Sequence, residues 1–197
     1  MLADTLKNYN VILATRSPRR RELFKGLDIP FSIAPNYDIN ETPPTSMRLL
    51  DVPSYLAESK SDQYPKPLAE NDILITADTL VVCDNELMGK PMDRKDAIRM
   101  LHKLSNNKHE VLTGVCIRTT DKKRMFDVST YVYFRRLKKS EIEYYVDNYQ
   151  PYDMAGSYGV QEWLGYIAVE RIEGSYYNVM GLPVQRLYAE LMEFMDD

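Results

Sequence analysis

Hydroxyl and arginine side chains cluster near the start of the chain. The apolar run 11–14 is followed by Thr15, Ser17 and Pro18, and then by the arginines at 19–21. Ser-Pro is typical of a helix N-cap and first helical position, and a helix N-terminus binds anions. Arginines there oppose the helix dipole unless an anion offsets them. The pattern predicts a phosphate site, with a solvated basic turn as the alternative.

Asp78 is the second residue with chemical potential, because it lies within the otherwise apolar stretch 73–83. Aspartate is rare in strands and costly to bury without a partner. We therefore expect Asp78 to bind a metal or another cation, or to transfer a proton. The alternative is a carboxylate that only accepts hydrogen bonds from a neighbouring turn. Glu41, after the strand-like residues 31–34, is a further candidate. Carboxylate oxygens favour Mg²⁺ or Mn²⁺ over zinc.

Two lysines and one loop complete the candidates. Lys60 and Lys90 are isolated basic residues, and Lys90 stands in the tight turn 88–91; taken alone, each is more simply a solvated lysine. The loop 155–161 is bordered by glycines and contains Tyr158, which could form a wall of a nucleobase pocket. No Walker A or GxGxxG motif is present, so the pattern excludes a P-loop or Rossmann protein.

Composition restricts the class of protein. The chain has 25 basic and 29 acidic residues, a net charge of −4, which disfavours non-specific nucleic-acid binding. Cys83 and Cys116 lie in apolar runs without zinc spacing, so we expect buried free thiols in a reducing cytoplasm. The first ten residues are polar and no apolar run is long enough for a membrane span, so we expect neither a signal peptide nor a membrane anchor.

Hydrophobic periodicity predicts the elements that would position these residues. Strands are expected at 11–14, 73–83, 110–118, 126–134 and 166–172. Helices are expected after Ser17, over 53–62, after Asp93, from a capping box at 140–143, and over 183–195. Helices and strands alternate, but one strand pair is typical of a meander. We therefore expect an α/β fold with a mixed sheet.

Several segments, in order along the chain, resemble the Maf family of nucleotide pyrophosphatases. They are Leu13-Ala-Thr-Arg-Ser-Pro-Arg-Arg-Arg-Glu-Leu23, Ala77-Asp-Thr-Leu-Val-Val82, Gly89-Lys-Pro-Met-Asp93, Met100-Leu-His-Lys-Leu-Ser105, Val111-Leu-Thr-Gly114, Ala155-Gly-Ser-Tyr-Gly-Val-Gln161 and Ile172-Glu-Gly-Ser-Tyr-Tyr-Asn-Val-Met-Gly-Leu-Pro183. Each segment alone is a weak signal, whereas all of them in register are a specific one. Thr15 stands where the family usually has serine, Ser59 where glutamate is common, and Met154 where lysine is common.

The resemblance implies one Maf-like domain over 1–197, with two lobes, a central cleft and a fold akin to the inosine triphosphate pyrophosphatases. It implies a homodimer, a nucleoside triphosphate substrate and a divalent metal cation, Mg²⁺ or Mn²⁺. The implied roles are as follows: catalysis by Asp78, Lys60, Lys90 and Glu41; metal binding by Asp78 and Glu41; and substrate binding by Thr15, Ser17, Arg19, Arg20 and Gln161. Whether Asp78 is a general base or a metal ligand stays open.

The resemblance also implies the reaction and the substrate. Family members release pyrophosphate from a nucleoside triphosphate and leave the monophosphate. Arg19 follows Ser-Pro where a subgroup preferring 7-methyl-GTP has tryptophan, so this chain resembles the dTTP and UTP subgroup. The Gln161 amide can match the carbonyl–NH–carbonyl edge of thymine or uracil, and Gly156 and Gly159 would let the backbone approach the ring. The alternatives are a preference for other nucleotides, such as 7-methyl-GTP, and a nucleotide-binding regulator of septum formation with little turnover.

Overall fold

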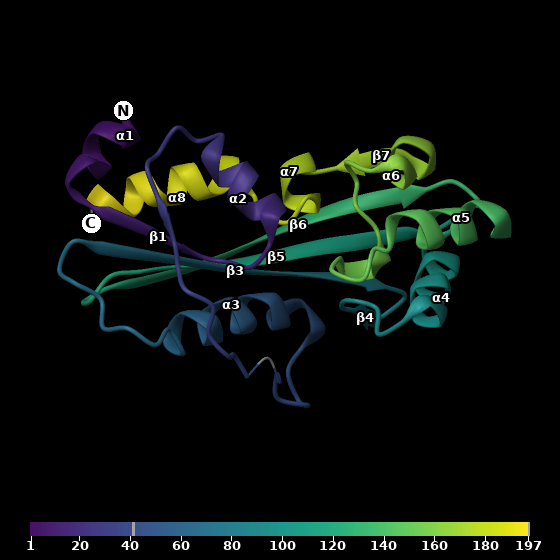
Figure 1. The fold of residues 1–197 in the computed structure, drawn as a ribbon, viewed down its shortest axis with the longest axis horizontal. Helices are drawn as coiled ribbons and strands as arrows, with labels where there is room; N and C mark the ends of the chain where they lie inside the picture. The colour runs from purple at the N-terminus through teal and green to yellow at the C-terminus, as the bar shows by residue number, and fades with distance from the viewer. Residues whose placement is uncertain (41, 197) are drawn as a thin grey trace. The chain divides into compact units, whose positions relative to one another are not determined.

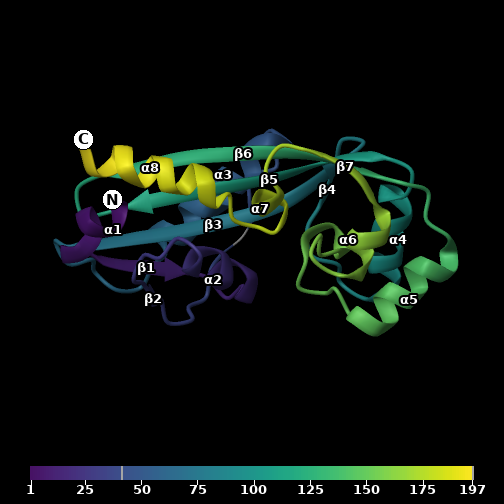
Figure 2. The same ribbon diagram turned by 90° about the horizontal axis from the view of Figure 1, so that it is seen from above.

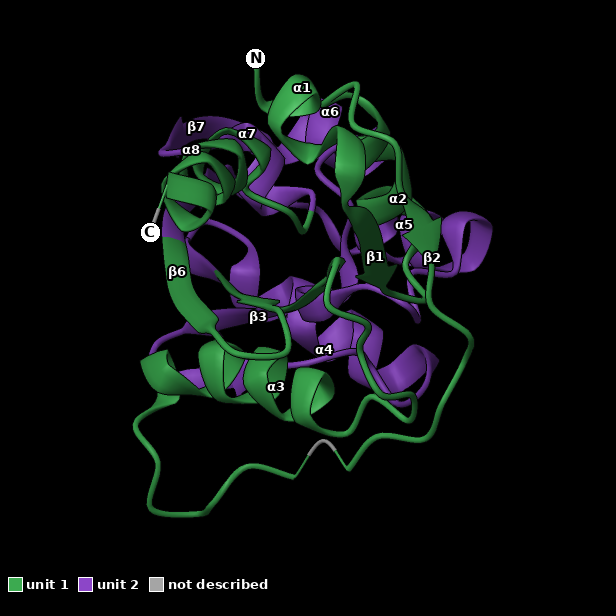
Figure 3. Cartoon of the chain, turned by 90° about the vertical axis from the view of Figure 1, so that its left-hand side faces the viewer, with its two compact units in different colours: residues 1–78, 113–128, 181–197 green, residues 79–112, 129–180 purple. Residues whose placement is uncertain are grey.

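The structure, a computed structural model, describes residues 1–40 and 42–196. The chain divides into two compact units (Figure 3). As far as they are described, unit 1 comprises Met1–Asp78, Thr113–Val128 and Gly181–Asp197, and unit 2 comprises Thr79–Leu112 and Ser129–Met180. Among the described residues, no helix is both long and apolar enough to cross a membrane. Cys83 and Cys116 are buried and free, as expected from the apolar runs in which they lie.

The strands form a mixed sheet, as expected. β1 (Asn10–Ala14) pairs in parallel with β2 (Ser32–Ile33) and β3 (Asp72–Cys83). β3 pairs antiparallel with β4 (Glu86–Met88), and β6 (Lys123–Phe134) pairs antiparallel with β7 (Val169–Glu173). With β5 (Lys108–Arg118), the hydrogen-bonded order is β2-β1-β3-β5-β6-β7, and β4 branches from β3. β3, β5 and β6 contribute residues to both units.

Helices cover both faces of the unit 1 strands. These helices are α1 (Leu2–Thr5), α2 (Pro18–Lys25), α3 (Val52–Asp62) and α8 (Val184–Asp196), with 3₁₀ turns at Leu6–Asn8 and Leu49–Asp51. α2 and α8 lie on one face and α3 lies on the other (Figure 1). α8 runs along β6 (Figure 2), where Arg124 of β6 forms ion pairs with Glu190 and Glu193 of α8, both at 3.1 Å.

Helix α3 packs closely on the sheet because strand β5 has a glycine beneath it. A Cβ atom at Gly114 would overlap the backbone of Pro53 and Ser54 at the start of α3. The helix buries Leu56 and Ala57 against the strands. The side-chain hydroxyl of Thr76 on β3 donates to the carbonyl of Ala57 at 2.5 Å. The position of α3 is therefore fixed by its backbone as well as by its apolar side chains.

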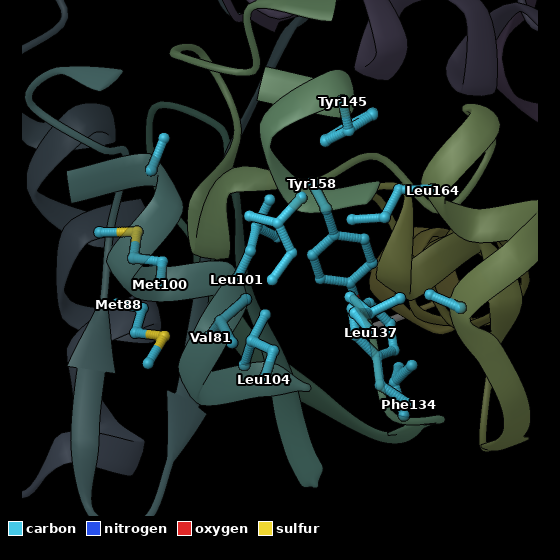
Figure 4. Packing of buried hydrophobic residues seen from close by; sticks show 14 of the residues in the cluster. Val81, Met88, Met100, Leu101, Leu104, Phe134, Leu137, Tyr145, Tyr158 and Leu164 are labelled. Carbon is cyan, nitrogen blue, oxygen red and sulfur yellow. The ribbon is translucent and has the colours of Figure 1, made fainter. Parts of the chain in front are cut away.

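Unit 2 has its own hydrophobic core. Its helices are α4 (Arg94–Leu104), α5 (Lys139–Tyr149), α6 (Trp163–Ala168) and α7 (Tyr176–Val179), with a 3₁₀ turn at Ala155–Ser157. Figure 4 shows part of this core, in which Leu101 of α4 and Leu164 of α6 lie beside Tyr158. Tyr145 of α5 and Phe134 belong to the same cluster. Asp84 and Asn85 join β3 to β4 with φ of 50° and 61°, as two-residue hairpin turns require.

Most of the predicted elements are present, and two local predictions were wrong. Residues 163–168 form helix α6, so the strand expected at 166–172 begins only at Val169. Helix α5 is capped at Lys138, whose N–H donates to the Glu141 carboxylate at 2.8 Å, not by the box expected at Ser140. Glu141 also forms an ion pair with Arg135 at 3.0 Å.

Candidate active site

A hydroxyl-rich turn connects β1 to α2 in unit 1. The side chain of Ser17 accepts the N–H of Arg20 at 3.4 Å, and Pro18 occupies the first helical turn, as predicted. The hydroxyl of Thr15 accepts the N–H of Ser17 at 3.1 Å. Ala14 pairs with Thr76, so this turn follows β1 beside the position where β3 reaches Asp78. The turn combines a positive helix end with two hydroxyls, a suitable environment for phosphate oxygens.

The arginines after this turn are partly engaged within the protein. The guanidinium of Arg20 donates through Nε to the carbonyl of Gly181 at 2.7 Å and through Nη1 to that of Ala77 at 2.9 Å. Arg20 therefore ties the C-terminal segment to the strand position next to Asp78. Arg19 is half-buried. Phosphate binding by both arginines stays a prediction.

Asp78 forms an ion pair with Lys60 within unit 1. The Lys60 ammonium donates to Oδ1 of Asp78 at 2.5 Å, and these side chains are only 11% and 13% exposed. Two nearly buried opposite charges at this distance attract each other strongly, but both lose hydration on burial, so removing only one partner is costly. The strand-borne carboxylate therefore has a cationic partner, which is one of the alternatives raised for it.

Lys60 is held in place through its own backbone. The Tyr37 hydroxyl donates to the carbonyl of Lys60 at 2.8 Å, and Arg16 donates to the carbonyl of Tyr37 at 2.7 Å. Burial and the nearby Tyr64 raise the pKa of Tyr37 to about 12, so it stays a neutral donor near pH 7. The segment around Tyr37 is thereby joined to α3 beside the ion pair. Sequence reasoning missed this tyrosine, because nothing in its local pattern marks it.

Lys90 and Gln161 lie in unit 2. Lys90 is exposed, and the turn before it is joined to the loop at 155–161 because the N–H of Gly156 donates to the carbonyl of Gly89 at 3.0 Å. The side-chain oxygen of Gln161 is buried and has no hydrogen-bond partner among the described residues. A buried acceptor without a protein partner is costly unless a water molecule, an ion or a ligand supplies the missing hydrogen bond.

The two loop glycines have intramolecular roles. Gly156 has φ of +67°, and a Cβ there would lie 2.9 Å from Val81. A Cβ at Gly159 would lie 2.8 Å from the Gln161 side-chain nitrogen. The Gln161 amide therefore lies against the backbone of Gly159, and the approach of a nucleobase to this glycine stays a prediction.

Tyr158 belongs to the core of unit 2, not to an exposed pocket wall. Its side chain is 6% exposed, and its hydroxyl lies 2.7 Å from Nε2 of His109. Burial lowers the pKa of His109 to about 3, so the imidazole is neutral near pH 7. No local sequence pattern marks His109, yet it is 1% exposed and contacts Phe134 edge-on. This histidine fastens the loop at 157–161 to strand β5.

The carboxylate of Asp78 provides oxygen atoms of the kind that bind divalent cations. The described residues contain no group of three or more His, Cys, Asp or Glu side chains that could hold a metal. Mg²⁺, however, is commonly bound by one or two carboxylates together with substrate phosphates and water. Glu41, the second predicted ligand, lies outside the described residues. The chemistry of Asp78 fits a cation that arrives with a phosphate chain.

Comparison with known proteins identifies the class. Residues 10–194 match the family model described as Maf-like protein. A dTTP/UTP pyrophosphatase of Parabacteroides distasonis is 51% identical over 98% of this chain and 100% of its own length. Proteins of the same name from Porphyromonas gingivalis strain W83 and Bacteroides thetaiotaomicron are 49% and 46% identical, over 98% and 96% of this chain and 98% of each relative. This chain belongs to the Maf family.

Solved structures give weaker matches. A dITP/XTP pyrophosphatase of Mycobacterium abscessus aligns at 14% identity and a TM-score of 0.44, covering 94% of this chain and 98% of that one. A HAM1 protein of Coxiella burnetii aligns at 9% identity and a TM-score of 0.46, covering 94% and 99%. Both scores are below 0.5, so the fold class rests on the chain's own mixed sheet and helices.

Proposed function

We propose that this protein hydrolyses dTTP and UTP to the nucleoside monophosphate and pyrophosphate. The observation that carries the proposal is the 51% identity, over essentially the whole of both chains, to a protein named dTTP/UTP pyrophosphatase. The local chemistry agrees with it, because unit 1 combines an anion-binding helix end with a buried Lys60–Asp78 ion pair.

The proposed chemistry begins with a water molecule oriented by Asp78. The water oxygen attacks the α-phosphorus while its proton passes to the Asp78 carboxylate, and the bond from the α-phosphorus to the bridging oxygen breaks. Pyrophosphate leaves with that oxygen. Lys60 keeps Asp78 in one position through the 2.5 Å contact. The N-terminus of α2, the hydroxyls of Thr15 and Ser17, and Arg19 and Arg20 stabilise the negative charge of the phosphates.

The remaining site residues complete the proposal. Lys90 binds phosphate, and the buried oxygen of Gln161 accepts a hydrogen bond from the N–H of uracil or thymine. Glu41 contributes a second carboxylate. In the alternative in which Asp78 is a metal ligand and not the base, Asp78 and Glu41 would hold a divalent cation that neutralises charge on the phosphate oxygens. The proposal has three further parts. Residues 1–197 act as one two-lobed domain, and the protein is a cytoplasmic homodimer. Lys90 and Glu41 act in catalysis.

A panel of nucleoside triphosphates tests the substrate class. With Mg²⁺ present, we expect pyrophosphate release from dTTP and UTP to exceed release from CTP, ATP and GTP by about tenfold or more in kcat/KM, since an unsatisfied buried polar group costs on the order of 1–3 kcal/mol. A preference for 7-methyl-GTP would assign the protein to another subgroup. Nucleotide binding without turnover would indicate a regulator and would contradict the proposed hydrolysis.

Chelation tests the proposed metal. EDTA should abolish pyrophosphate release from UTP, and excess Mg²⁺ or Mn²⁺ should restore it, because phosphate charge would otherwise be neutralised only by the arginines and lysines. Full activity after exhaustive chelation would remove the metal from the proposal. Light scattering at several protein concentrations tests the homodimer in the same preparation.

A further inference from the structure

One buried hydroxyl holds both ends of the turn that carries Gln161. Tyr145 of α5 is fully buried, and its hydroxyl accepts the N–H of Gly159 at 3.1 Å. The same hydroxyl forms a short hydrogen bond to the Glu162 carboxylate. The N–H of Glu162 donates to the carbonyl of Gly159 at 3.0 Å, which closes the turn. Tyr145 is therefore bonded to the residues at the two ends of the segment 159–162.

The Gln161 side chain depends on the shape of this turn. Its amide nitrogen lies so close to Gly159 that a Cβ there would be 2.8 Å away, and its oxygen is buried without a partner among the described residues. A shift of Gly159 or Glu162 would therefore move the amide that the proposed function assigns to the base. Hydrogen bonds that fix a recognition group in one geometry reduce the conformational entropy that is lost when the ligand binds.

Residues on both sides of this turn are held by a hydrogen bond or by close packing. On one side, Tyr158 is buried and bonded to His109. On the other side, α6 begins at Trp163, and a Cβ at Gly165 would overlap the carbonyl of Val160. Glu162 is only partly buried, so its carboxylate would turn toward water without a donor from α5. The phenol of Tyr145 is the group that keeps it inward (Figure 4 shows this tyrosine in the core).

We propose that Tyr145, acting through Gly159 and Glu162, is a positioning residue for base selectivity. The inference rests on the proposed function, because it assigns the selection of uracil and thymine to the Gln161 amide. Tyr145 itself contacts neither base nor phosphate in this account. Its contribution is to hold the amide at one place, so that a carbonyl–NH–carbonyl edge is bound and the cytosine edge is rejected.

Replacing Tyr145 by phenylalanine tests the proposal while keeping the ring in the core. We expect the ratio of kcat/KM for UTP to that for CTP to fall by about fivefold or more, since one buried N–H and one carboxylate lose their partner. The matched control is Tyr149→Phe, which removes a hydroxyl from a 40% exposed tyrosine stacked on Tyr145 in the same helix. That variant should keep the wild-type ratio.

Two further variants separate positioning from folding. Glu162→Ala removes the other partner of the hydroxyl at a partly exposed position and should lower the ratio as Tyr145→Phe does. Glu162→Gln keeps an acceptor for the hydroxyl and should retain most of the selectivity. In a Gln161→Ala background, Tyr145→Phe should produce no further change in the ratio, because residues that act through one group are not additive.

Binding measured without turnover distinguishes failure of this inference from failure of the proposed function. Trp163 is the only tryptophan and adjoins Glu162, so its fluorescence reports UTP and CTP affinities in EDTA. If the wild type binds UTP more tightly than CTP and Tyr145→Phe loses this preference, the inference is supported. This result would support it even if the protein released no pyrophosphate. Equal losses for both nucleotides, or an unchanged ratio with a lower melting temperature, would make Tyr145 merely structural. No wild-type preference would overturn the inference as well.

Discussion

Removing one partner of the Asp78–Lys60 ion pair should lower both the stability and the activity of the protein. Asp78→Asn keeps the shape of the side chain but leaves the nearly buried Lys60 ammonium beside a neutral amide. We expect a loss on the order of 1–3 kcal/mol in the free energy of unfolding, below the full cost of breaking a buried pair because both groups retain some exposure. Pyrophosphate release should fall by about 10²–10⁴. Denaturant unfolding and steady-state kinetics measure the two effects.

The matched control is the double variant Lys60→Met with Asp78→Asn. Two neutral side chains of similar size should recover most of the lost stability, whereas activity should stay low because the carboxylate is still missing. Activity near the wild-type level in Asp78→Asn would exclude Asp78 from the chemistry. Stability that does not recover in the double variant would mean that Asp78 has structural partners other than Lys60.

His109 should make stability depend on pH. Burial lowers its pKa from 6.5 to about 3 in the folded protein, so between these values the unfolded chain binds a proton that the folded chain does not. Its stabilising effect is therefore fully present above pH 6.5 and is lost as the pH falls toward 3. The loss is at most about 1.4 kcal/mol per pH unit.

Urea unfolding from pH 7 to pH 4 measures this effect. We compare the wild type with His109→Gln, whose amide can still bond to the Tyr158 hydroxyl but does not titrate. The variant should show a smaller decrease in stability over this interval. Parallel curves for the two proteins would show that His109 does not contribute.

Some site residues were predictable from the sequence and others were not, and the difference has physical reasons. Ser17 was predicted correctly as a helix cap, because capping uses a local pattern of serine, proline and a following helix. The Lys60–Asp78 pair was not foreseen as a pair, since it joins residues far apart in sequence. Tyr37, Tyr145 and His109 gave no local signal, because each acts through a tertiary hydrogen bond.

At the scale of elements, the placement of α3 depends on Gly114. A Cβ there would overlap the backbone of Pro53 and Ser54, which no side-chain rotation can relieve. Gly114→Ala should therefore displace α3, destabilise the protein by about 1–3 kcal/mol and lower the activity that depends on Lys60. Thermal unfolding and UTP turnover measure these effects.

Gly26→Ala is the control for this substitution in the same unit. Gly26 has φ of −66°, and the nearest atom to a Cβ there, the carbonyl oxygen of Leu23, is 3.4 Å away. Its stability should change by no more than about 0.5 kcal/mol. A stable and fully active Gly114→Ala variant would mean that α3 can move without disturbing Lys60.

Helices and strands with a clear period were predictable, and short elements under tertiary control were not. α4 has an Asp93 cap and an amphipathic face, and it begins where expected. Residues 163–168 are apolar and aromatic, which favours a strand in isolation. They form α6 because Gly165 lets the helix pack against Val160. Such a close approach is invisible in the local sequence.

At the scale of the whole molecule, the family match spans residues 10–194 and so includes both compact units. Unit 1 contains the hydroxyl-rich turn and Asp78, and unit 2 contains the loop at 155–161. The mixed sheet was predictable from the alternation of elements. The division into units was not predictable from composition, because β3, β5 and β6 each contribute to both.

The central claim is hydrolysis at the α-phosphorus of dTTP and UTP. Its most direct test is mass spectrometry of the products formed from UTP in water enriched in oxygen-18, with Asp78→Asn as the background control. We expect UMP and pyrophosphate in equal amounts, with the label in UMP, because water attacks the α-phosphorus. Label in pyrophosphate would place the attack at the β-phosphorus, and UDP with orthophosphate as products would contradict the claim altogether.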